Sequence, residues 1–78
     1  MKERKIIMDA LKEFLERCLL YCSWNETRID RMKSMHQAFG AVQFYSAITH
    51  STQEWNEIEA LWNDNYKPKF EELVYGVA

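Results

Sequence analysis

Hydrophobic residues recur every three to four positions along most of the chain, which is the spacing of one face of an α-helix. The first such segment runs from Lys2 to about Cys22. Its expected inward stripe is Ile7, Leu11, Phe14, Cys18 and Tyr21, widened by Ile6, Ala10, Leu15, Leu19 and Cys22. Charged residues occupy most of the other positions, so this segment is predicted to be an amphipathic helix.

A second helix is predicted from about Glu26 to Ile48. The connection before it is short, and either Ser23 or Asn25 is placed to cap the new helix. Its expected inward stripe is Ile29, Met32, Met35 or His36, Phe39 and Val42. A connection this short makes the first two helices antiparallel neighbours.

The second helix changes character after Gly40, a residue that disfavours a helix interior. The following positions leave almost no polar face: Ala41, Val42, Phe44, Tyr45, Ala47 and Ile48. A helix that is apolar all round is buried on more than one side. This half of the helix is therefore predicted to lie either at the centre of the bundle or at an interface between chains.

A third helical segment follows Thr49–Ser51, with Ser51 and Glu54 at capping-box spacing. Its apolar side carries Trp55, Ile58, Leu61, Trp62 and Tyr66. Pro68 interrupts the backbone hydrogen bonds of a helix, which leaves two interpretations. One is a single helix to about Tyr75, kinked between Asp64 and Pro68.

The other interpretation is a break near Asn65 and a short fourth helix with Pro68 at its first position. The apolar phase continues through Phe70, Leu73 and Val77, which favours the continuous, kinked helix. Gly76 is a suitable residue to end it.

Composition supports an all-α fold. The 78 residues include two Gly and one Pro, too few for the many turns of a β-rich protein of this length. We therefore predict one helical domain, residues 1–78, folded as a three-helix bundle whose third helix is kinked or broken near Pro68. A chain of this size has little interior, so some of its three Trp, four Tyr and four Phe are expected at the surface.

Exposed aromatic residues usually mark contact sites. The interaction candidates are Phe44, Tyr45, Trp55, Trp62 and Tyr66. The alternative for the stripe of Trp55, Trp62 and Tyr66 is ordinary core, because aromatic residues at helical spacing generally face inward. Residues 1–39 carry eight Lys/Arg and six Asp/Glu, whereas residues 40–78 carry two and six. Acidic groups beside the aromatic face would steer a basic partner, or the two halves simply pack together.

No motif points to catalysis or to a cofactor. Cys18 and Cys22 lie four residues apart, but the pattern lacks the second pair that a zinc site needs, and buried Cys ordinarily behaves as a small hydrophobe. His36 is expected at the rim of the core and His50 in a solvated turn. No metal, cofactor or catalytic residue is predicted.

Nucleic-acid binding is disfavoured by charge. The second and third helices resemble a helix-turn-helix in outline, but the third carries no Lys or Arg before Lys67. Arg28, Arg31 and Lys33 form a weak basic patch that Glu26 and Asp30 dilute.

No apolar run approaches the length of a membrane span, and Asp9 interrupts any signal-like segment. The chain is expected to be cytoplasmic. The function predicted from the sequence is protein binding or self-association through an aromatic-rich face, without enzymatic activity. The alternatives are a nucleic-acid-associated regulator, by direct binding or acidic mimicry, and a small all-α enzyme with a site between helices.

Overall fold

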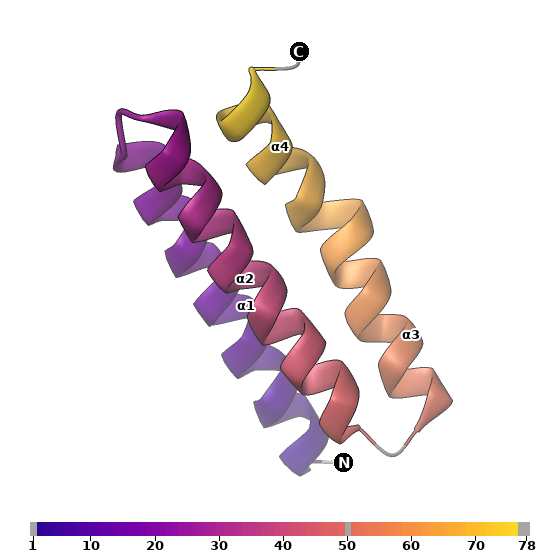
Figure 1. Ribbon diagram of the computed structural model, residues 1–78. Helices are drawn as coiled ribbons and strands as arrows, with labels where there is room; N and C mark the ends of the chain where they lie inside the picture. The colour runs from indigo at the N-terminus through magenta and orange to yellow at the C-terminus, as the bar shows by residue number, and fades with distance from the viewer. Residues whose placement is uncertain (1, 50, 77–78) are drawn as a thin grey trace.

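The computed structural model describes the backbone of residues 2–49 and 51–76, and the side chains of these ranges from Met8 onward. It contains α1 (Lys2–Trp24), α2 (Arg28–Ile48), α3 (Thr52–Ala60), a π-helical segment η1 (Leu61–Tyr66) and α4 (Lys67–Tyr75). The last three join end to end, and we call them together the third helix. The predicted all-α three-helix bundle is confirmed (Figure 1).

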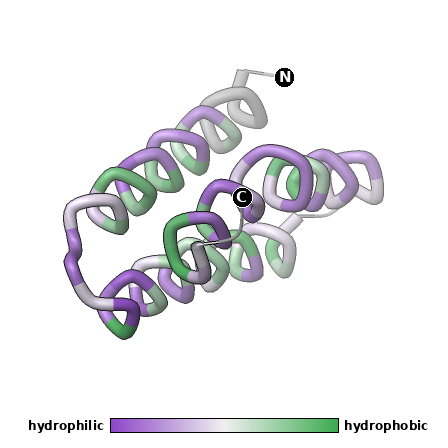
Figure 2. The backbone as a smooth tube through the Cα atoms, turned by 90° about the horizontal axis from the view of Figure 1, so that it is seen from above, coloured by the Kyte–Doolittle hydropathy of each residue, from purple (hydrophilic) through white to green (hydrophobic). Residues whose placement is uncertain are grey.

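The three helices lie side by side around one core (Figure 2). α1 and α2 run antiparallel and pack along their length, and the third helix turns back beside them (Figure 1). Residues spaced three or four apart on each helix supply the buried set: Leu11, Leu15, Cys18, Cys22, Ser34, Ala38, Val42, Ile58, Trp62, Tyr66, Phe70 and Val74.

The inward face of α1 is rotated from the predicted stripe. Leu11 and Cys18 are buried as expected, but Phe14 and Tyr21 are 40% and 50% exposed. Leu15 and Cys22 take their place in the core. Both rows have helical spacing, and the smaller side chains allow α1 and α2 to pack closely. Ile6 and Ile7 of the predicted stripe lie outside the described side chains.

The inward face of α2 differs in the same way. Ser34, Ala38 and Val42 are buried, whereas Ile29 and Phe39 of the predicted stripe are exposed. Small residues again line the close contact between the two antiparallel helices. The uncharged half of α2 is covered on one side only within the described part of the chain, since Phe44 and Ile48 are exposed. That half is therefore not central in the bundle.

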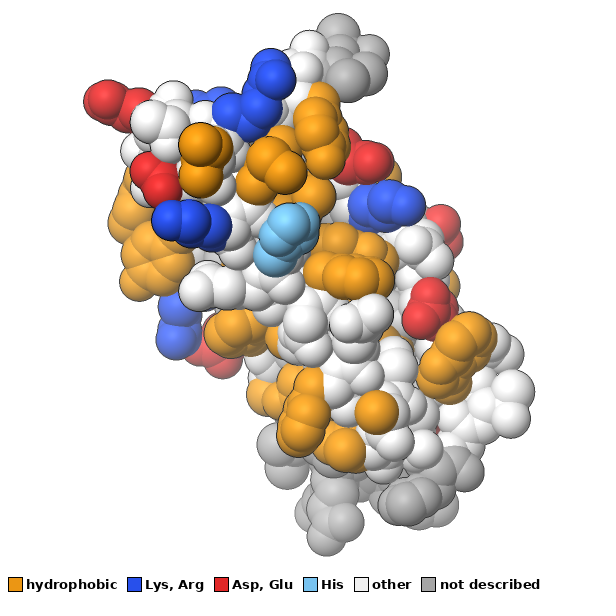
Figure 3. Space-filling view, in the orientation of Figure 1, with side chains coloured by type: hydrophobic (Ala, Val, Ile, Leu, Met, Phe, Trp, Pro, Cys, Tyr) orange, Lys and Arg blue, Asp and Glu red, His pale blue; other side chains and the backbone are white. Residues whose placement is uncertain are grey.

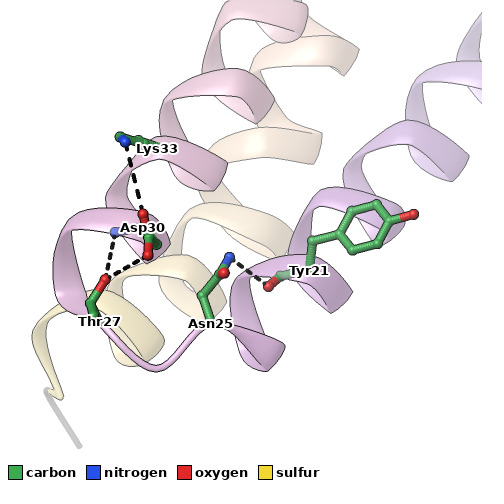
Figure 4. Close-up of polar contacts among 5 residues, drawn as sticks. All are labelled: Tyr21, Asn25, Thr27, Asp30 and Lys33. Carbon is green, nitrogen blue, oxygen red and sulfur yellow. Dashed lines mark hydrogen bonds and ion pairs between the residues drawn. The ribbon is translucent and has the colours of Figure 1, made fainter.

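The turn between α1 and α2 is capped later than predicted. Thr27, rather than Ser23 or Asn25, precedes α2: its side chain accepts a hydrogen bond from the backbone N–H of Asp30 at 3.2 Å. The Thr27 hydroxyl donates to the Asp30 carboxylate at 2.9 Å, and Lys33 lies 3.8 Å from the same carboxylate (Figure 4). Asn25 instead ends α1, because its side-chain amide donates to the carbonyl of Tyr21 (Figure 4).

The start of the third helix follows the prediction. The side chain of Ser51 accepts a hydrogen bond from the backbone N–H of Glu54 at 3.3 Å, which confirms Ser51 as the cap. The carboxylate of Glu54 accepts a hydrogen bond from the Thr49 hydroxyl, so it ties the helix start to the end of α2. His50 of this connection lies outside the described residues.

The third helix is continuous, as favoured, and Pro68 lies in the first turn of α4. The irregularity is the π segment that ends at Tyr66. The buried residues of the third helix lie at constant four-residue spacing: Ile58, Trp62, Tyr66, Phe70 and Val74. A regular α-helix turns about 100° per residue, so each four-residue step passes a full turn by about 40°. Four such steps would rotate the row of side chains about 160° away from the core. The extra residue that a π turn contains recovers about 100° of this drift.

The C-terminal end of the third helix is fixed by a glycine and an arginine. Gly76 adopts the left-handed conformation, with φ 68° and ψ 27°, and ends the helix as predicted. Arg31 of α2 donates through its Nη1 to the carbonyl of Leu73 at 2.9 Å, and through its Nε to the carbonyl of Asn25 at 2.7 Å. One guanidinium thus satisfies terminal carbonyls of two helices. Val77 lies outside the described residues.

Tyr66 makes the stability of the fold depend on pH in the alkaline range. Its hydroxyl donates to the carboxylate of Glu16 on α1 at 2.7 Å. Burial, then this hydrogen bond and the negative charge of Glu16, raise the pKa of Tyr66 from 10.0 to about 12. The folded state therefore keeps the phenol protonated where the unfolded state ionises.

We expect the free energy of unfolding to be independent of this group below pH 10 and to fall between pH 10 and about 12. The loss is about 3 kcal/mol, since the pKa rises by about two units and each unit corresponds to about 1.4 kcal/mol. Urea titrations across this range measure it. Tyr66→Phe should flatten the decline, while Tyr75→Phe, at an exposed position, should leave it unchanged. An identical decline in Tyr66→Phe would contradict the assignment.

Candidate protein-binding surface

An open groove of about 700 Å³ lies between α1 and α2. We call it the α1/α2 groove. It is lined by Ala10, Glu13, Phe14, Arg17, Gln37, Ala41, Phe44 and Tyr45, and none of these belongs to the third helix. Alanines and aromatic rings together line it, which gives a surface of hollows and protrusions.

The aromatic side chains of the groove are available to solvent to different degrees. Phe44 is 62% exposed and Phe14 is 40% exposed, whereas Tyr45 is half-buried and packs against the core. The rings of Phe44 and Tyr45 meet edge to face, with centroids 5.9 Å apart. Tyr45 therefore holds Phe44 from one side, and the Phe44 ring presents its other surface outward.

The charge of the groove is balanced. Glu13 and Arg17 are the charged residues among its lining, and their side chains form an ion pair at 3.3 Å. Both are exposed, so the pair adds little to stability. The groove therefore presents apolar surface and no net charge.

The five predicted interaction residues do not form one surface. Phe44 and Tyr45 line the α1/α2 groove. Trp55 is 46% exposed and lines a separate hollow with Ser46, Thr49, Ser51 and Thr52. Trp62 and Tyr66 are only 4% and 5% exposed, because they pack in the core. Of the two interpretations of the stripe of Trp55, Trp62 and Tyr66, core therefore applies to Trp62 and Tyr66, and an exposed position applies to Trp55.

The burial of Trp62 has a clear cause. Its ring lies 5.7 Å, centroid to centroid, from both Phe39 and Phe70. It thus bridges α2 and α4 at the level where the π segment turns the third helix. A binding role is open to Phe44, Tyr45 and Trp55, while Trp62 and Tyr66 support the fold.

Sequence reasoning missed the contribution of α1 to this surface. Phe14 and Arg17 line the groove, yet Phe14 had been assigned to the core. Tyr21 and Trp24, farther along α1, are also exposed, and their rings meet edge to face at 5.5 Å. The available signal was the second apolar row of α1, whose smaller residues suit a close helix contact better.

Comparison with known proteins adds no constraint. No protein-family model, curated protein or solved structure matches the chain. Interpretation of the surface therefore depends on its geometry and chemistry alone.

The cysteines belong to the core. Cys18 and Cys22 are both free thiols, and Cys22 donates to the carbonyl of Arg31 at 3.5 Å. Burial raises the pKa of both thiols above the usual value, which opposes the thiolate form that binds metals or attacks substrates. Among the described residues, no group of three or more His, Cys, Asp or Glu side chains is placed to hold a metal ion.

Two of the basic residues of α2 interact with other groups of the same chain. The guanidinium of Arg31 is bound to two backbone carbonyls, and Lys33 is close to Asp30. Viewed over α2 and the third helix, hydrophobic side chains form separate patches with charges of both signs between them (Figure 3). This face has no continuous basic stripe of the kind that follows a phosphate backbone.

In the part of the chain that the structure describes, no helix combines the length and the apolar character that crossing a membrane requires.

Proposed function

We propose that this protein is not an enzyme and acts by binding protein through the α1/α2 groove. The observation that carries the proposal is the exposure of Phe44, at 62%, beside Phe14 in a hollow with no net charge. Aromatic residues dominate the energetics of protein interfaces. The lining contains no His, Cys or Ser side chain that would serve as a nucleophile or base.

The free thiols of Cys18 and Cys22 support a cytoplasmic setting for this binding. The charge of the groove supports a different partner chemistry from the one expected from the sequence. Acidic residues were expected beside the aromatic surface, but the groove balances Glu13 with Arg17. We therefore infer an apolar rather than a basic partner surface.

The proposal is tested by cross-linking in cells that encode the protein. A photoreactive phenylalanine analogue, p-benzoylphenylalanine, replaces Phe44 in one variant and Trp55 in a matched variant. We expect covalent protein adducts from position 44 and few or none from position 55, with mass spectrometry identifying the adduct. Absence of any protein adduct at position 44, including one to a second copy of the chain, would refute groove binding.

A further inference from the structure

The outward side of α2 has no charge over more than three turns. Residues 37–48 contain no Lys, Arg, Asp or Glu, although Phe44, Ile48, Gly40 and Ala47 are exposed there. A surface helix ordinarily carries charged residues on its solvent side. The composition of this stretch suits a covered surface, yet the described part of the chain leaves it open.

Gly40 gives an independent indication. A glycine in a helix interior costs about 1 kcal/mol relative to alanine. A Cβ atom added at Gly40 would meet nothing within 4 Å, so packing inside the chain does not require a glycine there. Close approach of another backbone to α2 would require one. Gly40 lies four residues before Phe44, on the same side of the helix.

The absence of charge favours an uncharged partner for this surface. An acidic or basic partner would bury charges opposite residues 37–48 without a counterpart, which is costly. Residues 37–48 of a second copy bring no such charge, and Glu13 and Arg17 of its groove are already paired with each other. The net charge of −2 per chain gives little long-range repulsion between copies.

Shape and area are also suited to a second copy. The surface combines protruding rings, Phe14 and Phe44, with small residues, Ala10, Gly40 and Ala41, so two copies related by a two-fold axis can place rings over small residues. Tyr21 extends the row of Phe14 at seven-residue spacing.

At about 200 Å² per fully exposed ring, the exposed fractions of Phe14, Phe44 and Tyr21 amount to about 300 Å² per chain. Two copies would bury about 600 Å² from these rings alone. Ile48 and the intervening residues raise the total toward the roughly 1,200 Å² of a stable interface.

We propose that the protein forms a two-fold symmetric homodimer in which the α1/α2 grooves and the uncharged faces of α2 of two copies pack against each other. This inference rests on the proposed function and names its partner as a second copy of this chain.

Light scattering after size-exclusion chromatography tests the proposal. The wild-type protein should have about twice the 9.4 kDa mass of one chain at micromolar concentration. Phe44→Glu should weaken dimerisation at least tenfold, because it buries two unpaired carboxylates in a symmetric interface. Trp55→Glu is the matched control: it places the same charge on another exposed aromatic position and should leave the dimer intact.

Gly40→Glu is a second test variant, chosen because it should disrupt the dimer without unfolding the monomer. Glutamate favours helix more than glycine, and a Cβ atom at position 40 would meet nothing within 4 Å, so the monomer should remain folded by circular dichroism while the dimer dissociates. A monomeric wild-type protein, or a dimer that survives both Phe44→Glu and Gly40→Glu, would overturn the homodimer. Cross-links from position 44 to a different protein, with a monomeric wild type, would retain the proposed function and reject this inference.

Discussion

Phe70→Ala should leave the protein largely unfolded at room temperature. Phe70 is fully buried and is the largest of the fully buried side chains. Replacing such a phenylalanine by alanine removes its transfer free energy and leaves a cavity, which together cost about 3–5 kcal/mol. A core in a chain of this length rarely supplies more than about 3–5 kcal/mol in total. The loss is therefore comparable with the whole stability of the fold.

The measurement is urea unfolding followed by circular dichroism. Phe44→Ala is the matched control, because it makes the same chemical change at a position that is 62% exposed. Its free energy of unfolding should stay within about 1 kcal/mol of the wild-type value when both are measured as monomers. Equal destabilisation by the two substitutions would show that the assignment of core and surface is wrong.

Deleting one residue from the π segment and inserting one into it should have very different effects on the stability of the protein. Deleting Asp64, an exposed residue of the π segment, should be tolerated within about 1 kcal/mol. The deletion converts the spacing of the buried residues from four throughout to four, three, four and four. That pattern stays on one face of a regular α-helix without a π turn.

Inserting one alanine after Asp64 should unfold the protein. The insertion turns Tyr66, Phe70 and Val74 about 100° away from the core. Losing the burial of each large apolar side chain costs about 1.5–3 kcal/mol, which exceeds the stability available to a chain of this size. Thermal unfolding of the two variants side by side gives the comparison. A destabilised deletion variant and a stable insertion variant would contradict the role assigned to η1.

The helices and their order followed from hydrophobic spacing and cap residues, because these are local properties. The third helix begins after Ser51 and ends at Gly76, as predicted. The first turn was less accurate, since Ser23, Asn25 and Thr27 are all suitable caps and only packing selects among them. The π segment was not foreseen as such, although the constant four-residue spacing from Ile58 to Val74 now explains it.

The candidate surface was predicted only in part. Phe44 and Tyr45 were found because the stretch after Gly40 lacks charge. Trp62 and Tyr66 have the same chemical character as surface aromatics, and their burial depends on the helix phase set by η1. Phe14 was assigned to the core because two apolar rows compete on α1. Which row faces inward depends on how closely α2 approaches α1, and this distance cannot be predicted from the local sequence of either helix.

The contacts of Arg31 at the end of the bundle depend on the position of the backbone and not on the identity of the side chains at its acceptor residues. Both of its acceptors are main-chain carbonyls, at Asn25 and Leu73. Any residue can supply a carbonyl, so substitutions at these two sites leave the guanidinium its partners. What they must preserve is the place where each helix stops. Arg31 thus constrains where the first and third helices end, and it holds three chain segments in alignment through contacts that do not involve the side chains of Asn25 and Leu73.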